Sequence, residues 1–373
     1  MHKKHILLLY ITEVSGHHTA SCAIEKALHL VSNSVTTLNI NAFRFTSPLT
    51  EKITNKIYTT VIKRTPKLWD LLYDNRKFKK KIERIKKHVD WINSQKIKKL
   101  IEEFNPNAVV CTQAYPCSMV SMYKKIYKNS LPLFAVLTDF APHAYWFYEN
   151  VDYYICPHEK IADRIIKEGI PPEKVKPFGI PHDPDFRINL NRKTICQHFL
   201  LDERKPTILI MGGGQGLGPI KSIVRSLEKL HFIIQVLIVT GTNKKLFLDL
   251  KKKARQSKHK IVVFGYTNKI SELMSISDVI ITKPGGITTS EALTKQLPII
   301  IIKPIPGQEA NNTLFLTQEK AAIKVEKPEN IHSIITDLFE HPEKKEALQQ
   351  ACKRLSKPSA AIDTAKFILE NCR

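Results

Sequence analysis

The sequence predicts an α/β protein made of two doubly wound domains, and two observations support that fold class. Short apolar runs alternate along the chain with longer amphipathic stretches, which is the pattern of βαβ units around parallel sheets. The runs also form two series, separated by a polar stretch at 181–206. We expect strands at 6–11, 108–112, 134–139 and 153–156, and then at 207–211, 235–240, 261–264, 279–282, 299–302 and 321–325.

The domain boundaries follow from these two series. At 373 residues the chain is long enough for two domains. We predict a first domain over residues 1–185, a second over 186–355, and a final helical segment over 356–373. Pro181 and Pro184 favour an extended linker, because a residue that precedes proline is biased away from helix.

The composition is strongly basic, with a net charge of +23. Residues 51–100 alone hold 16 Lys and Arg against 5 Asp and Glu. Such an excess favours a polyanionic partner, which means nucleic acid, an anionic membrane or phosphorylated substrates. No signature of a nucleic-acid-binding module accompanies the charge, so no nucleic-acid partner is expected.

A predicted helix over 78–104 carries much of this charge. Lys79, Lys80 and Lys81 lie at its start, and Trp69 precedes it in an aromatic, leucine-rich segment. The basic face is either a solvated side of a crossover helix or a surface that binds an anionic bilayer.

The cysteines and the lengths of the apolar runs bear on the cellular compartment in which the protein is expected. Seven cysteines are scattered without a CxxC pair, which argues for reducing conditions and against a structural zinc site. The first apolar run, 6–11, is too short for a signal peptide, and no run reaches membrane-spanning length. We therefore expect a cytoplasmic protein whose membrane contact, if any, is peripheral.

A glycine turn after the strand at 279–282 is the most informative segment. Gly285 and Gly286 open a helix, and free amides at a helix N-terminus bind anions. Glu291 falls in the second turn, within reach of a ligand hydroxyl. Diphosphate at the helix end and ribose at the glutamate form a consistent nucleotide site; the alternative is a glycine turn beside a solvated glutamate.

A second glycine loop, 211–218, follows another strand, but it lacks the spacing of a dinucleotide fingerprint. The next strand ends in Thr240 and Gly241, without the acidic residue that would hold an adenosine ribose. A nicotinamide-dependent oxidoreductase is therefore disfavoured, although the loop can still approach phosphates.

Two side chains in the first domain are candidate bases. His17 follows the first strand, at the carboxyl edge of the sheet where α/β domains bind ligands. Asp139 ends another strand of this domain, and it either shares the same cleft or caps the following helix.

Several motifs together resemble one family. They are SGH ending at His17, TDFxxHxxW at 138–146, GIP at 179–181, MGGGQGLGP at 211–219, TKPGGIT with Glu291 at 282–291, and KPIPGQEANN at 303–312. In this order they resemble the monogalactosyldiacylglycerol synthases of plants and the processive diacylglycerol glucosyltransferases of bacteria, over nearly the whole chain.

The resemblance implies a GT-B fold of two Rossmann-like domains, the first binding the acceptor and the second a UDP-sugar, with the last segment returning to the first domain. It implies no metal and no other cofactor. It also implies the donor residues Gly212, Gly213, Gly214, Gln215, Gly216, Tyr266, Thr267, Lys283, Gly285, Gly286, Glu291, Gln308, Glu309 and Asn312. The acceptor or membrane residues would be Gly16, His143, Trp146, Trp69, Lys79, Lys80 and Lys81.

The function implied is inverting transfer of a hexose from UDP-glucose or UDP-galactose to diacylglycerol, with His17 or Asp139 as the base. Two departures from the family bear on this expectation. Val14 and Ser15 replace glycines of the first loop, and Gln215 replaces an acidic residue of plant-like members. The alternative is an N-acetylglucosaminyltransferase acting on a polyprenyl-linked peptidoglycan precursor.

Overall fold

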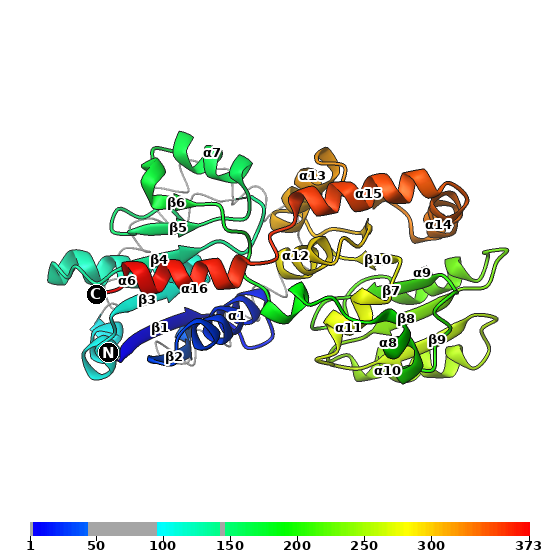
Figure 1. The fold of residues 1–373 in the computed structure, drawn as a ribbon, viewed down its shortest axis with the longest axis horizontal. Helices are drawn as coiled ribbons and strands as arrows, with labels where there is room; N and C mark the ends of the chain where they lie inside the picture. The colour runs from blue at the N-terminus through cyan, green and yellow to red at the C-terminus, as the bar shows by residue number, and fades with distance from the viewer. Residues whose placement is uncertain (1–2, 44–94, 142–145) are drawn as a thin grey trace. The chain divides into compact units, whose positions relative to one another are not determined.

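The computed structural model describes residues 3–43, 95–141 and 146–373 (Figure 1). The chain divides into two compact units. One comprises Met1–Pro184, Ile305–Gln308 and Ser359–Arg373, and the other comprises Asp185–Pro304 and Glu309–Pro358. Each unit contains a six-stranded sheet in which all strand pairs are parallel, so the predicted α/β fold class is confirmed.

The sheet of the first unit has the strand order β2-β1-β3-β4-β5-β6. The strands are β1 (Lys4–Tyr10), β2 (Val35–Asn41), β3 (Ala108–Cys111), β4 (Leu133–Val136), β5 (Tyr153–Ile155) and β6 (Val175–Lys176). The helices are α1 (Gly16–Val31), α6 (Ala114–Tyr127), α7 (Glu159–Lys167) and α16 (Ala360–Asn371), with residues 95–104 also helical. Central strands such as β1 and β3 are buried on both faces, as crossover helices require.

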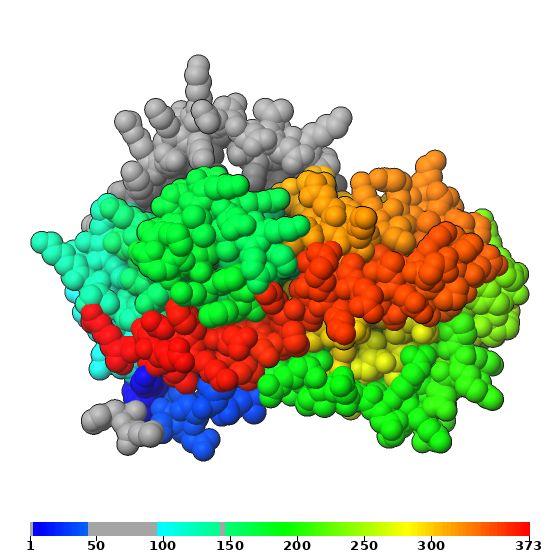
Figure 2. All heavy atoms as spheres, turned by 45° about the horizontal axis from the view of Figure 1, so that its top comes forward, coloured from blue at the N-terminus to red at the C-terminus, as the bar shows by residue number. Residues whose placement is uncertain are grey.

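The last helix, α16, packs on α1 over one face of this sheet. Figure 2 shows it in red between the green and blue segments of the first unit. Ala361, Ala365 and Ile368 join the buried core that α1 forms with β1 and β3. Lys4 Nζ donates to the carbonyl of Leu369 at 2.6 Å, which ties the end of the chain to the first strand.

The sheet of the second unit has the strand order β12-β11-β10-β7-β8-β9. The strands are β7 (Thr207–Met211), β8 (Gln235–Val239), β9 (Lys260–Phe264), β10 (Val279–Thr282), β11 (Ile299–Ile302) and β12 (Ala322–Val325). The helices are α8 (Arg192–His198), α9 (Ile220–Leu227), α10 (Lys244–Ala254), α11 (Ile270–Ser275), α12 (Gly286–Thr294), α13 (Gln308–Gln318), α14 (Ile331–Glu340) and α15 (Pro342–Leu355).

The structure corrects three details of the sequence prediction. The strand predicted over 134–139 ends at Val136, because its neighbour β5 ends at Ile155; Asp139 therefore lies in the following loop. The linker predicted over 181–206 is not extended throughout, since Asn191 caps the short helix α8 inside it. Two edge strands, β2 and β6, were not predicted, because β2 is rich in Thr and Asn and β6 has two residues.

Candidate active site and nucleotide-binding loops

Each sheet has an internal switch point, where the strand order reverses. In the first unit β1 lies between β2 and β3, and in the second β7 lies between β8 and β10. The loops after β1 and β3, and those after β7 and β10, are therefore neighbours at the carboxyl edge of their sheets. Open α/β sheets bind ligands at such points. Most of the candidate residues that the structure describes follow three of these strands, β1, β7 and β10.

His17, in the first turn of α1, is held by residues from two other strands of its sheet. Its Nδ1 lies 2.9 Å from the carbonyl oxygen of Thr112, which follows β3, and 2.9 Å from Oγ1 of Thr138, which follows β4. Thr112 Oγ1 donates in turn to the carbonyl oxygen of His17 at 2.9 Å. The switch point therefore fixes both the backbone and the ring of this histidine.

These contacts define the protonation state of the His17 ring. A carbonyl oxygen only accepts hydrogen bonds, so Nδ1 carries the proton and Nε2 carries the lone pair. Burial lowers the pKa of His17 to about 4, and the hydrogen bond to Thr112, which favours the protonated ring, offsets this only in part. Among the residues that the structure describes, none hydrogen-bonds Nε2. A neutral ring with an available lone pair is the form that a general base requires.

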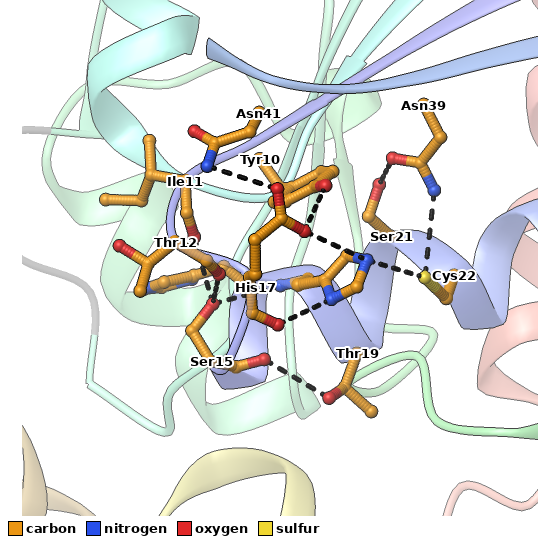
Figure 3. Close-up of polar contacts among 12 residues, drawn as sticks. Tyr10, Ile11, Thr12, Ser15, His17, Thr19, Ser21, Cys22, Asn39 and Asn41 are labelled. Atoms are coloured by element: carbon orange, nitrogen blue, oxygen red, sulfur yellow. Dashed lines mark hydrogen bonds and ion pairs between the residues drawn. The ribbon is translucent and has the colours of Figure 1, made fainter. Parts of the chain in front are cut away.

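The neighbouring His18 is held differently, by contacts that involve Tyr10 and Cys22, both of which are labelled in Figure 3. Its Nδ1 lies 2.7 Å from the carbonyl oxygen of Glu13, and its Nε2 lies 3.2 Å from Sγ of Cys22. Tyr10 packs against the His18 ring and donates its hydroxyl proton to the Glu13 carboxylate at 2.7 Å. Both nitrogens of His18 thus have partners within α1 and the preceding loop, so this ring is a structural element of the loop.

The loop between β1 and α1 is itself tightly determined. Ser15 caps α1 by accepting from the amide of His18 at 3.2 Å, and its hydroxyl reaches the carbonyl oxygens of Ile11 and Thr12. Thr12 has a φ of 61°, a left-handed conformation that is strained for a β-branched residue. Gly16 is exposed at the start of the helix.

The other predicted residues of the first unit fall in two groups. Asp139 follows Thr138 directly and is partly exposed, and Trp146 is buried at 5% exposure. The roles of Asp139 and Trp146 stay predictions. His143, Trp69, Lys79, Lys80 and Lys81 lie outside the described residues.

In the second unit, the glycine loop 212–218 packs against the loop after β8. The amide and hydroxyl of Thr242 reach the carbonyl oxygen of Gly214 at 2.9 and 3.3 Å, and Asn243 Nδ2 donates to that of Gly216 at 3.4 Å. Gly216 has a φ of 59°, and a Cβ there would lie 2.0 Å from the carbonyl oxygen of Thr240. Gly216 is therefore required for loop packing, a role that its place in a predicted phosphate loop did not indicate.

Gly213, by contrast, has a φ of 69° and open space where a Cβ would lie. Gly212 is packed against the backbone of Leu217, and Gln215 is exposed. Backbone in such alternating conformations can offer amides to an anion.

The turn after β10 and the start of α13 are joined by two contacts. Lys283 Nζ lies 2.7 Å from Oε1 of Glu309, in a pair whose side chains are 14% and 21% exposed. Asn312, fully buried, donates from Nδ2 to the carbonyl oxygen of Pro284 at 2.9 Å. These contacts connect Lys283, Glu309 and Asn312, three of the donor residues that the resemblance implies.

The helix that follows this turn starts with an uncapped end. Gly285 is the N-cap of α12 and Gly286 its first residue, and no side chain of the cap bonds the first amides. Such an end favours an anion. Glu291 is buried in the second turn at 8% exposure. Gln308 begins α13 and is partly exposed.

Two of the donor residues that the resemblance implies, Tyr266 and Thr267, follow the edge strand β9, away from the switch point. Tyr266 is 75% exposed, and Thr267 Oγ1 accepts from the amide of Lys269 at 3.2 Å. The exposed Tyr266 ring offers a face for stacking.

Two kinds of feature are absent from the described part of the chain. Within residues 3–43, 95–141 and 146–373, no group of three or more His, Cys, Asp or Glu side chains is placed to hold a metal ion. In the same residues, no helix is both long and apolar enough to cross a membrane.

Comparison with known proteins defines the class of the chain. Residues 17–181 match the family model of monogalactosyldiacylglycerol (MGDG) synthase, and residues 207–364 match that of the glycosyltransferase family 28 C-terminal domain. Among solved structures, MurG of Acinetobacter baumannii has a TM-score of 0.66 at 14% identity, covering 98% of this chain and 99% of that one. SnogD, a glycosyltransferase from Streptomyces nogalater, has a TM-score of 0.59 at 12% identity over 99% of both chains. The chain therefore has the predicted GT-B fold of a glycosyltransferase.

Curated relatives are more specific. The processive diacylglycerol beta-glucosyltransferase of Bacillus pumilus (strain SAFR-032) is 31% identical over 84% of this chain and 82% of its own length. The enzyme of the same name from Bacillus subtilis (strain 168) is 31% identical over 90% of this chain and 87% of its own. The chain belongs to this family, which combines an MGDG synthase domain with a family 28 glycosyltransferase domain, as the motifs predicted.

Proposed function

We propose that this chain is a UDP-sugar-dependent hexosyltransferase that glycosylates the free hydroxyl of diacylglycerol at a membrane surface. The family supports the reaction class, since its relatives are named diacylglycerol glucosyltransferases. The observation that carries the proposal is the state of His17. Its Nδ1 is bonded to the Thr112 carbonyl, so the lone pair is on Nε2.

In this proposal the reaction is a single displacement with inversion. His17 Nε2 takes the proton of the acceptor hydroxyl as the oxygen forms a bond to the anomeric carbon of the sugar. The bond from that carbon to the diphosphate oxygen breaks, and its electron pair stays on UDP. No metal takes part, and the sugar donor is the only small substrate besides the lipid.

The residues of the second unit then bind the donor. The uncapped amides of α12, with Gly285 and Gly286, and the ammonium of Lys283 offset the charge that develops on the diphosphate. Glu291 binds ribose hydroxyls and Glu309 sugar hydroxyls.

The donor is proposed to be UDP-glucose, because the relatives are named glucosyltransferases. UDP-galactose is the second donor to try. The enzyme is proposed to act in the cytoplasm as a peripheral protein on an anionic membrane.

The test uses the full-length protein with diacylglycerol in phosphatidylglycerol vesicles and one donor at a time: UDP-glucose, UDP-galactose or UDP-N-acetylglucosamine. UDP release is measured, and the lipid product is separated by thin-layer chromatography. A glycolipid formed with UDP-glucose supports the proposal. UDP binding without lipid product from any of the three donors would refute diacylglycerol as the acceptor.

Adjacent histidines provide a matched pair of variants for the mechanism. His17→Asn removes Nε2 and is expected to lower kcat by about 10² to 10⁴-fold, the usual range for a positioned base. His18→Asn lies one position further along the same helix, and its nitrogens bond within the loop. That variant is expected to keep most of the activity. Equal losses in both variants would show that the loop, and not the His17 base, is what matters.

A further inference from the structure

The second unit carries a basic surface that the donor site does not use. Residues 244–260 contain eight Lys and Arg and one acidic residue, Asp249. They form α10, its C-terminal turn and the start of the edge strand β9, with α10 labelled at the lower right of Figure 1. This charge is separate in sequence from the basic region at 51–100.

The periodicity of α10 places the cations on one side. Leu246 and Leu250 face the core of the sheet and are buried. At about 100° per residue, the opposite side is centred on Leu248, and all its neighbours within about 60° are basic. These neighbours, all exposed, are Lys244, Lys245, Lys251, Lys252 and Arg255. We call Leu248 together with these five neighbours the α10 face.

Leu248 is itself 59% exposed at the centre of these cations. An isolated exposed leucine is ordinary, but one surrounded by cations at i±3 and i±4 has the composition of a surface that inserts into anionic lipid. The methylene stems of lysines are apolar, so lysines beside an exposed leucine add to the apolar area of such a surface.

The positions of the lysines argue against a role in helix stability. Cations in the last turn of a helix, such as Lys251 and Lys252, stabilise it through the helix dipole. Lys244 and Lys245 are in the first turn, where cations are unfavourable, and that turn holds no acidic residue. These two lysines therefore lower helix stability, and an external anion explains their presence.

Neighbouring elements add further positive charge to this surface and few acidic side chains to offset it. Lys221 and Arg225 are exposed on α9 beside α10. Over 220–260 the acidic residues are Asp249, which pairs with Lys221 at 2.5 Å, and Glu228, which accepts a hydrogen bond from Ser257. The surface thus has a large net positive charge.

We infer that the α10 face is a second membrane-docking surface, which binds anionic phospholipid headgroups and inserts Leu248 among them. The inference deepens the proposed function, because a lipid acceptor requires the enzyme to reside on a bilayer. It does not depend on which sugar is transferred.

The test measures binding of the full-length protein to phosphatidylglycerol–phosphatidylcholine vesicles that contain neither diacylglycerol nor UDP-sugar. The variant K244Q/K245Q/K251Q/K252Q is expected to bind at least about tenfold more weakly, since each cation contributes separately to attraction. Leu248→Ser is expected to weaken binding by about fivefold. The difference between the lysine variant and the unmodified protein should shrink as salt is added, because salt screens the attraction of the lysines to the anionic lipid.

The matched control is K193Q/K320Q/K327Q/K353Q, which removes the same charge from exposed positions elsewhere in the second unit. It should bind vesicles as the unmodified protein does. Melting temperature and UDP affinity should be unchanged in all variants. Because the vesicles support no transfer, a failure of glycolipid synthesis and a failure of this inference are separate results.

Three outcomes overturn the inference. The α10 variant binds vesicles like the unmodified protein, or the control loses binding equally, which would indicate net charge alone. In the third, the α10 variant loses binding to a single-stranded RNA oligonucleotide and keeps binding to vesicles, which would make this a nucleic-acid surface.

Discussion

The low pKa of His17 leads to a pH profile that an ordinary histidine does not give. The base must be neutral to accept a proton, so activity falls as the pH drops through its pKa. A histidine of ordinary pKa, about 6.5, is only roughly one tenth neutral at pH 5.5. Burial lowers the pKa of His17 to about 4, so nearly all of it is neutral at that pH. We expect kcat/KM to stay level from neutral pH down to about 5.

The same shift affects stability, and its sign follows from which state binds more protons. In the unfolded chain His17 is protonated below its ordinary pKa, while in the folded chain it stays neutral until the pH reaches about 4. Folding stability is therefore lost as the pH falls between these values. At about 1.4 kcal/mol per pKa unit, the full loss is at most about 3.5 kcal/mol, and solvent screening of this half-buried residue reduces it.

The assay is UDP release against pH, with the free energy of unfolding measured over the same range. His17→Asn should lose activity at every pH and become less sensitive to acid in its stability. A midpoint of kcat/KM near 6.5 would refute the reasoning about burial. If Asp139 is the base, His17→Asn keeps its activity and Asp139→Asn loses it.

Three further predictions concern single residues. Thr138→Val removes one of the two hydrogen-bond partners of His17 Nδ1. It should lower kcat by about three- to tenfold with KM unchanged, because one hydrogen bond contributes about 1 kcal/mol. An unchanged kcat would mean that the Thr112 contact alone positions the ring. Gly216→Ala should lower the free energy of unfolding by more than about 2 kcal/mol, because the alanine would need a left-handed backbone and its Cβ would clash with the Thr240 backbone. Gly213→Ala should lower it by only about 1 kcal/mol, because only the left-handed backbone is unfavourable there. Equal melting temperatures of the two variants would contradict this prediction. Lys283→Met should weaken UDP binding, measured by calorimetry, by at least about tenfold, because it removes the cation paired with Glu309. Glu309→Gln should instead raise KM for the UDP-sugar and leave UDP affinity nearly unchanged. If both variants lose UDP affinity equally, the pair is only structural.

The candidate base illustrates how far the sequence reaches. His17 is recognisable because it follows an apolar strand, a position that lies at the ligand edge of any parallel sheet. Thr112, one of its two partners, is 95 residues further along the chain and follows a different strand, β3. Nothing local distinguishes Thr112 from other threonines, since the contact exists only because β1 and β3 are neighbours.

The donor loops show the same division. The glycines at 212–216 and 285–286 mark turns that approach an anion, and their spacing excludes a dinucleotide fingerprint. Which loops are adjacent decides the rest. The loop after β8 makes Gly216 necessary for packing against Thr240, and the start of α13 brings Glu309 to Lys283.

The sequence by itself determined the fold class, ten of the twelve strands that the structure describes, the family and the positions of the candidate residues along the chain. It could do so because period, turn chemistry and motif spacing are local properties of the chain. Only the tertiary structure decided the tautomer of His17, the Lys283–Glu309 pair and the exposed basic side of α10. Each of these depends on sheet order or on which side of a helix is buried, and both are set by contacts between residues distant in the sequence.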